Sequence, residues 1–227
     1  MDPRYPSDPA SLPLWPLPLL AGVLPLMISH VAWWLSVHEG LVPLCNVYLD
    51  GCLSISRAAR YGLGNDLFRM VMLPCATLQT LCWVVASAWL RRDVPGAVPT
   101  LPWLGLAVGI ALMLYATFLG SEGRTYELLR RYGTVIYFGG TGLALLVTLR
   151  ALSQNRSALA YRALLVIAWG MLGIGLASVV VAYSVDEPGR RDGWRNVLEW
   201  HLGLWLTAIY LALAWLWRRE RWRLTPQ

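Results

Sequence analysis

The chain has 227 residues, of which 57% are hydrophobic and only 14% are charged. A soluble domain has about a quarter of its residues charged, so this composition excludes an ordinary soluble protein. The net charge of +6 would suggest nucleic acid as the partner of a soluble protein, but arginines beside membrane spans serve to anchor and orient them. We therefore expect a polytopic, all-α membrane protein that binds no nucleic acid.

Six apolar runs predict six transmembrane helices in a single domain that covers residues 1–227, because each run is close to the roughly 20 residues that cross a hydrocarbon core. The runs lie at residues 17–37, 68–90, 101–120, 133–152, 161–183 and 194–217. Residues 1–16 are rich in proline, which predicts an extended or irregular segment. Residues 218–227 form a basic tail.

The placement of charge predicts that both termini are cytoplasmic. The tail "WRRERWR" is basic, and the connections "RRDVPGAVPT" and "SQNRSA" are short and contain few acids. Arginine-rich connections stay on the cytoplasmic side, so the loops at 38–67, 121–132 and 184–193 are expected on the outer face. All the basic residues are arginines, a usage typical of a GC-rich bacterial genome, so we expect the bacterial inner membrane.

The segment "SISRAARYG" in the first outer loop predicts a short helix. Ser54 is a suitable N-cap, Ala58 and Ala59 favour helix, and Gly62 is a natural helix end. Such a helix either lies along the membrane surface or only plugs the top of the bundle.

Several motifs resemble the Frag/DRAM/Sfk superfamily of six-span proteins. The first span is followed by "HEGLVPLCNVYLDGCLSIS" and "LFRMVMLP"; the family's "SIS"-like loop motif matches Ser54–Ser56, and its aromatic–arginine pair matches Phe68 and Arg69. The stretches "RRYGTVIYFGGTGL" and "NVLEWHLGLWL" are similar to its fourth and sixth spans, the latter with Glu199 as the acidic residue. Two arginines stand where the family often has a histidine. The family includes the factor that remodels lipids of GPI anchors, the autophagy modulators and a yeast protein of lipid asymmetry. The resemblance therefore implies binding or remodelling of a lipid.

Ionisable residues within spans are costly and mark candidate sites. Arg69 opens the second span and Glu199 enters the sixth, so we expect them on facing walls of one outer cleft, with His30 or His201 nearby and residues 54–62 above it. Such a cleft would bind a lipid head group, with Arg69 or Arg57 donating hydrogen bonds to phosphate. The alternative is an ion pair between Arg69 and Glu199 that only fixes helix packing.

The same region contains the residue types of a catalytic triad, which leaves open whether the protein is an enzyme. His201 would be the base, Glu199 its orienter or the acid, and Ser54 or Ser56 the nucleophile. No "GxSxG" motif accompanies them. A metal-independent acyltransferase or hydrolase that acts on lipid acyl chains is thus an alternative to lipid binding. A scaffold or regulatory subunit, with an unidentified membrane protein as its partner, is a second alternative.

We expect no metal and no cofactor. The three histidines are His30, His38 and His201. His30 and His38 would lie about 12 Å apart along one helix, whereas zinc ligands lie about 2 Å from the ion.

The four cysteines form two pairs in the sequence. Cys45 and Cys52 fall in the first outer loop, where an oxidising compartment would allow a disulfide between them. Cys75 and Cys82 fall within the second span and are expected to pack as small apolar residues.

Overall fold

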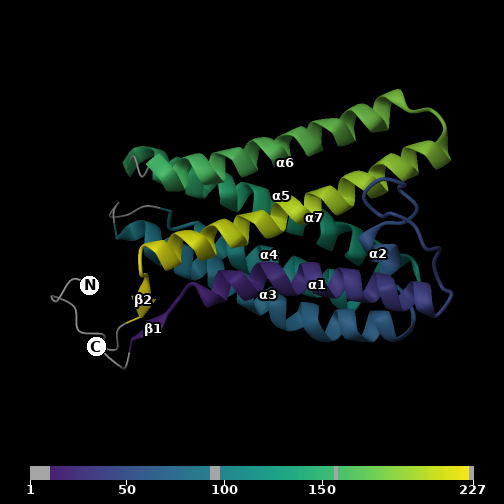
Figure 1. The fold of residues 1–227 in the computed structure, drawn as a ribbon, viewed down its shortest axis with the longest axis horizontal. Coiled ribbons are helices and arrows are strands. Elements are labelled where there is room, and N and C mark those ends of the chain that lie inside the picture. The colour runs from purple at the N-terminus through teal and green to yellow at the C-terminus, as the bar shows by residue number, and fades with distance from the viewer. Residues whose placement is uncertain (1–10, 93–97, 156–157, 225–227) are drawn as a thin grey trace.

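The computed structural model describes residues 11–92, 98–155 and 158–224, whose regular secondary structure is helical apart from one ribbon of two short strands. In chain order the elements are β1 (Leu12–Pro13), α1 (Pro16–His38), α2 (Ile55–Ala58), α3 (Gly62–Arg91), α4 (Leu101–Thr117), α5 (Arg124–Asn155), α6 (Ala158–Ser184), α7 (Pro188–Arg219) and β2 (Arg223–Leu224). The long helices run side by side along the longest axis, with α2 at one end and the ribbon at the other (Figure 1).

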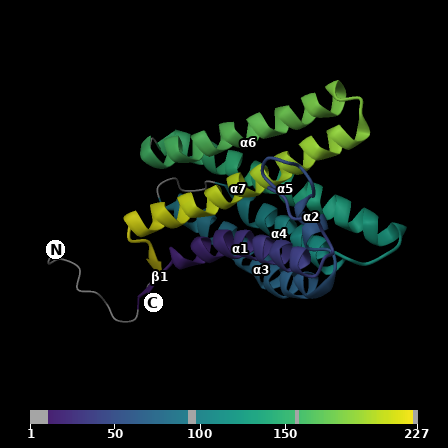
Figure 2. The same ribbon diagram turned by 45° about the vertical axis from the view of Figure 1, so that its right-hand side comes forward.

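The helices form a bundle in which each long helix lies beside its neighbours in the chain. α3 lies between α1 and α4, α4 packs on α5, and α7 bridges α1 and α6. α6 lies at one edge of the bundle, as the turned view in Figure 2 also shows. β1 pairs antiparallel with β2, with Leu12 opposite Leu224, so the two ends of the described chain meet at one end of the bundle.

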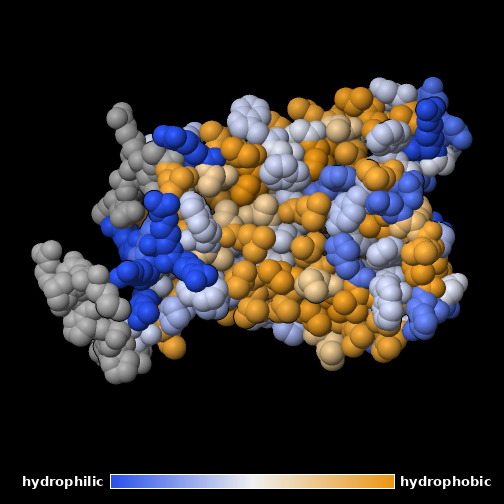
Figure 3. All heavy atoms as spheres, in the orientation of Figure 1, coloured by the Kyte–Doolittle hydropathy of each residue, from blue (hydrophilic) through white to orange (hydrophobic). Residues whose placement is uncertain are grey.

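Within the described ranges, five helices are long and apolar enough to cross a membrane, namely α1, α3, α5, α6 and α7. α4 has 17 residues and is a shorter apolar helix. An apolar band covers the middle of the visible face, and hydrophilic residues gather at both ends of the bundle (Figure 3). The length and composition of these helices therefore agree with an all-helical, multi-pass membrane protein.

Three helices begin earlier than the apolar runs predict. α3 begins at Gly62 instead of residue 68, α5 at Arg124 instead of residue 133, and α7 at Pro188 instead of residue 194. Hydropathy locates only the part of a helix that contacts lipid, whereas backbone hydrogen bonding continues through polar residues. The helices thus extend about two turns beyond the apolar band at the α2 end.

The short helix α2 covers Ile55–Ala58 only, which is less than the predicted segment. Ser54 is its N-cap, as expected, and its Oγ accepts a hydrogen bond from the backbone N–H of Arg57 at 3.2 Å. Gly62 has a φ of +65°, a conformation that favours glycine. This residue therefore reverses the chain and also starts α3.

Candidate functional site

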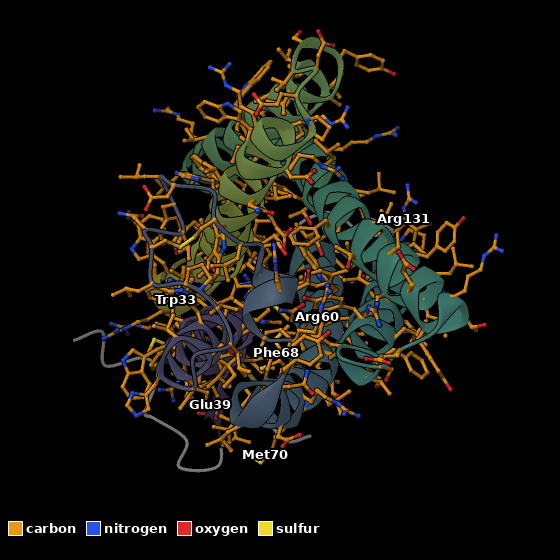
Figure 4. All side chains as sticks on the ribbon, turned by 90° about the vertical axis from the view of Figure 1, so that its right-hand side faces the viewer. Trp33, Glu39, Arg60, Phe68, Met70 and Arg131 are labelled. Carbon is orange, nitrogen blue, oxygen red and sulfur yellow. A yellow bond between two sulfur atoms is a disulfide. The ribbon has the colours of Figure 1, made fainter. Side chains whose placement is uncertain are left out.

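A cavity of about 110 Å³ lies inside the bundle, beneath α2. Its lining comes from α1, α2, α3, α4, α5 and α7 and is mostly apolar and aromatic, with Phe68, Tyr115 and Trp200 among the large side chains. Ile55 and Ser56 of α2 line the end of the cavity nearest to α2. Figure 4 views this end of the molecule, with α2 near the middle of the ring of helices and Phe68 beside it.

Glu199 is the one carboxylate among the residues that line this cavity. Its Oε1 accepts a hydrogen bond from the backbone N–H of Ile55 at 3.0 Å. The first N–H groups of a helix have no partner within the helix and favour an anion. Glu199 therefore fastens α2 to α7 and places its carboxyl group at the α2 end of the cavity.

The two candidate nucleophiles lie next to Glu199. The hydroxyls of Ser54 and Ser56 are 3.1 Å apart, and Ser56 lines the cavity. Ser54 is engaged as the N-cap of α2. Both serines thus belong to the structure that closes the cavity.

His201 is oriented by its own helix. Its Nδ1 lies 2.9 Å from the carbonyl oxygen of Val197, which can only accept a hydrogen bond, so Nδ1 carries the proton. Among the described residues, no hydrogen bond joins His201 to Glu199, Ser54 or Ser56. The structure does not assemble these four residues into a relay.

His30 of α1 belongs to an aromatic cluster with Tyr48 and Trp200. Its Nδ1 lies 2.8 Å from the carbonyl oxygen of Leu26, so Nδ1 donates and Nε2 is free to accept. The hydroxyl of Tyr48 lies 2.8 Å from this Nε2. Burial raises the pKa of Tyr48, which keeps its phenol protonated as the donor. The ring of Tyr48 also contacts Trp200 and His201 edge-on.

The loop that contains Tyr48 is tied to α7 at several points. Cys45 and Cys52 form a disulfide. Trp200 Nε1 donates to the carbonyl of Leu53 at 3.0 Å, and Asn196 Nδ2 donates to the carbonyl of Gly51 at 2.8 Å. The loop therefore forms part of a rigid outer cap over the bundle.

Arg69 does not face Glu199 across this cavity. It lines a second hollow, together with Arg60, and Arg57 is exposed on α2 and lines neither hollow. The neighbouring Phe68 occupies the inward position on α3, with 1% of its surface exposed. Successive residues on a helix differ by about 100° in direction, so Arg69 points to another side of α3.

Sequence reasoning missed the polar side chain at the inner part of the cavity. Pro25 has no N–H, so the carbonyl of Ala21 loses its helical partner. Gln79 Nε2 donates to this oxygen at 3.0 Å, and Gln79 is 1% exposed. The sequence signals for this contact were a proline within one predicted span, Pro25, and an amide side chain within another, Gln79.

In the ranges that the structure describes, no three His, Cys, Asp or Glu side chains lie close enough to hold a metal ion. Comparison of the chain with protein-family models, with curated proteins and with solved structures finds no match.

Proposed function

We propose that this chain is a six-span membrane protein that binds a lipid or lipid-like molecule in the cavity beneath α2. The observation that carries this proposal is the cavity itself, whose wall is apolar and aromatic and whose outer end has one carboxylate and one serine hydroxyl. Such a wall suits an alkyl chain, while a few placed polar groups orient the polar end of a ligand. The resemblance of "SIS" and its surroundings to a family with lipid roles agrees with this proposal.

The pairing of β1 with β2 supports six crossings. Two chain ends on the same side of a membrane require an even number of crossings. The five long helices alone would leave the ends on opposite sides, so α4 would be the sixth span. α4 is about 26 Å long, slightly less than a typical core of about 30 Å.

The disulfide between Cys45 and Cys52 supports an outer location for the α2 end, because disulfides persist in oxidising compartments. We infer that, in a bacterial inner membrane, the cavity lies at the outer leaflet and both termini lie in the cytoplasm. The contacts of Glu199 with Ile55 and of His201 with Val197 favour binding over the catalytic alternative.

Filling the cavity tests this proposal. Gly203 lines the cavity, and a Cβ added there would lie 3.4 Å from Ile55 Cδ1, so the larger side chain of Gly203→Leu would occupy the space beneath α2. Gly175→Leu is the matched control, because nothing lies within 4 Å of a Cβ at Gly175. Native mass spectrometry should find a bound lipid in the wild type and in Gly175→Leu, and none in Gly203→Leu. An unchanged lipid adduct in Gly203→Leu would contradict the proposal.

A further inference from the structure

A second hollow lies on the other side of the α2–α3 connection, at the boundary of the apolar band. Arg69 and Arg91 enclose residues 70–90 of α3, and these 21 residues span about 32 Å, close to a hydrocarbon thickness of about 30 Å. Met70, next to Arg69, is 63% exposed and lies at the outer surface of the bundle (Figure 4). This places Arg69 at the depth of lipid head groups.

The hollow has a volume of about 350 Å³. Arg60 and Arg69 line it, as do Tyr61, Asn65, Asp66 and the turn between α4 and α5 at residues 119–121. It shares no lining residue with the cavity beneath α2. The two hollows are therefore separate candidate sites, and each receives residues from the segment that joins α1 to α3.

Buried contacts hold the walls of the hollow in place. Asn65 is buried, and its Nδ2 donates to the carbonyls of Ala59 at 2.8 Å and Leu119 at 3.2 Å. Gly120 has a φ of +90°, and a Cβ there would lie 2.7 Å from the carbonyl oxygen of Arg60. The α4–α5 turn thus packs directly on the α2–α3 connection.

The turn does not neutralise the arginines of the hollow. Arg130 Nη1 donates to the carbonyls of Phe118, at 3.0 Å, and Ser121, so a third arginine already uses these two acceptors. A turn that is fixed on both sides in this way provides a firm edge beside Arg60 and Arg69.

Within the described ranges, the two guanidinium groups of the hollow have no counter-ion. In the described part of the chain, neither Arg60 nor Arg69 forms an ion pair or a side-chain hydrogen bond, and Arg60 Nε is buried without a partner. Asp66 lines the same hollow but is exposed and not paired with either arginine. The lining side chains therefore carry one net positive charge, and the planar donor groups of arginine match the oxygens of phosphate.

We propose that this hollow binds the phosphate group of a membrane lipid, with Arg60 and Arg69 as the donors. The depth of Arg69 at the edge of the apolar band favours a lipid-borne phosphate over a free one. The proposal does not depend on the cavity beneath α2, because the two sites share no lining residue.

The test compares matched probes on purified protein in neutral detergent. Dioctanoylphosphatidic acid should raise the melting temperature, whereas dioctanoylglycerol, which lacks the phosphate, and inorganic phosphate should not. Arg69→Gln and Arg60→Gln should each weaken phosphatidic acid binding about tenfold or more, because a charged hydrogen bond is lost. Asp66→Asn should strengthen binding, because it removes a negative charge from the hollow.

Arg131→Gln is the control for net charge, since Arg131 is exposed on the same side of the protein and lines neither hollow. It should bind phosphatidic acid as the wild type does. An equal loss in Arg131→Gln, or equal stabilisation by dioctanoylglycerol, would overturn the phosphate site. Equal stabilisation by inorganic phosphate would overturn its assignment to a lipid. Gly203 lines the cavity and not this hollow, so Gly203→Leu should bind phosphatidic acid as the wild type does. A failure of the cavity proposal can therefore be distinguished from a failure of the phosphate site.

Discussion

The contact between Gln79 and Ala21 shows how one residue compensates for another across two helices. Pro25 removes the hydrogen bond that the carbonyl of Ala21 would accept inside α1, and the Gln79 amide replaces it. Water cannot satisfy such a group inside a membrane, so an unpaired carbonyl there is costly. Gln79 is therefore a structural partner of the proline as well as part of the cavity wall.

This coupling predicts the outcome of a double-mutant cycle. Gln79→Leu should lower the free energy of unfolding by about 1–3 kcal/mol, because it leaves the carbonyl of Ala21 without a donor. In a Pro25→Ala background the restored N–H serves that carbonyl, so the same change should cost less. Thermal melting of the four proteins measures the difference. Equal losses in both backgrounds would show that Gln79 does not compensate for Pro25.

Tyr48 predicts a pH dependence at the residue scale. Its pKa is raised above the ordinary value of 10.0 by burial, so its contribution to stability is fully present below about pH 10 and is lost as the pH rises through the folded-state pKa. His30 accepts its hydrogen bond, and His201 lies against its ring. Tyr48→Phe should therefore remove part of the alkaline fall in melting temperature.

Tyr183→Phe is the matched control for that measurement, because Tyr183 is 87% exposed. Its melting temperature should follow the wild-type dependence on pH. An alkaline fall of the same size in Tyr48→Phe and in the wild type would show that Tyr48 remains neutral for another reason or titrates without consequence.

At the scale of elements, the loop between α1 and α2 acts together with α2 as the cap of the cavity. Val47, Leu53 and Ala58 pack around Trp200 in a small core of their own, and the Cys45–Cys52 disulfide closes the part of the loop that contains Val47. The cap thus has its own apolar core and its own covalent link, apart from the main core of the bundle.

Removal of the disulfide should loosen this cap. A cross-link over seven positions lowers the conformational entropy of the unfolded chain, which stabilises the folded protein by about 2–3 kcal/mol. The Cys45→Ser/Cys52→Ser protein should therefore melt at a lower temperature. Non-reducing peptide mass spectrometry should find Cys45 linked to Cys52 in the wild type. Two free thiols there, in protein made in an oxidising compartment, would contradict the link.

At the scale of the whole molecule, the topology rests on α4. If α4 crosses the membrane, a cysteine at position 100 and one at position 122 are reached by reagents from opposite sides. Thr100→Cys and Arg221→Cys should be labelled only after permeabilisation, while Leu49→Cys and Glu122→Cys should be labelled in intact cells. The two cysteines outside the disulfide, Cys75 and Cys82, are buried and should give little background.

The labelling tests the orientation of the protein and the number of its spans separately. Reversed labelling at all four positions would contradict the orientation and move the proposed sites to the cytoplasmic side. Labelling of positions 100 and 122 from the same side would contradict the crossing by α4 and hence the six-span topology.

Local chemistry explains which features were predictable from the sequence. The apolar runs located the helices because the preference of each residue for lipid adds along a segment. Ser54 was recognisable as an N-cap because its hydroxyl bonds to a backbone N–H three residues away. The helix starts at Gly62, Arg124 and Pro188 were placed too late, because hydropathy does not register polar turns that continue a helix.

Contacts between distant segments could not be predicted from the sequence, because they depend on the orientation of each helix about its own axis and on which helices pack together. Arg69 and Glu199 belong to different hollows because Phe68 takes the inward position on α3. Gln79 reaches Ala21 across 58 positions, a contact that requires α3 to pack on α1 at one particular register. Hydropathy sums independent preferences of single residues, whereas these contacts arise only when side chains from several helices fill one common space.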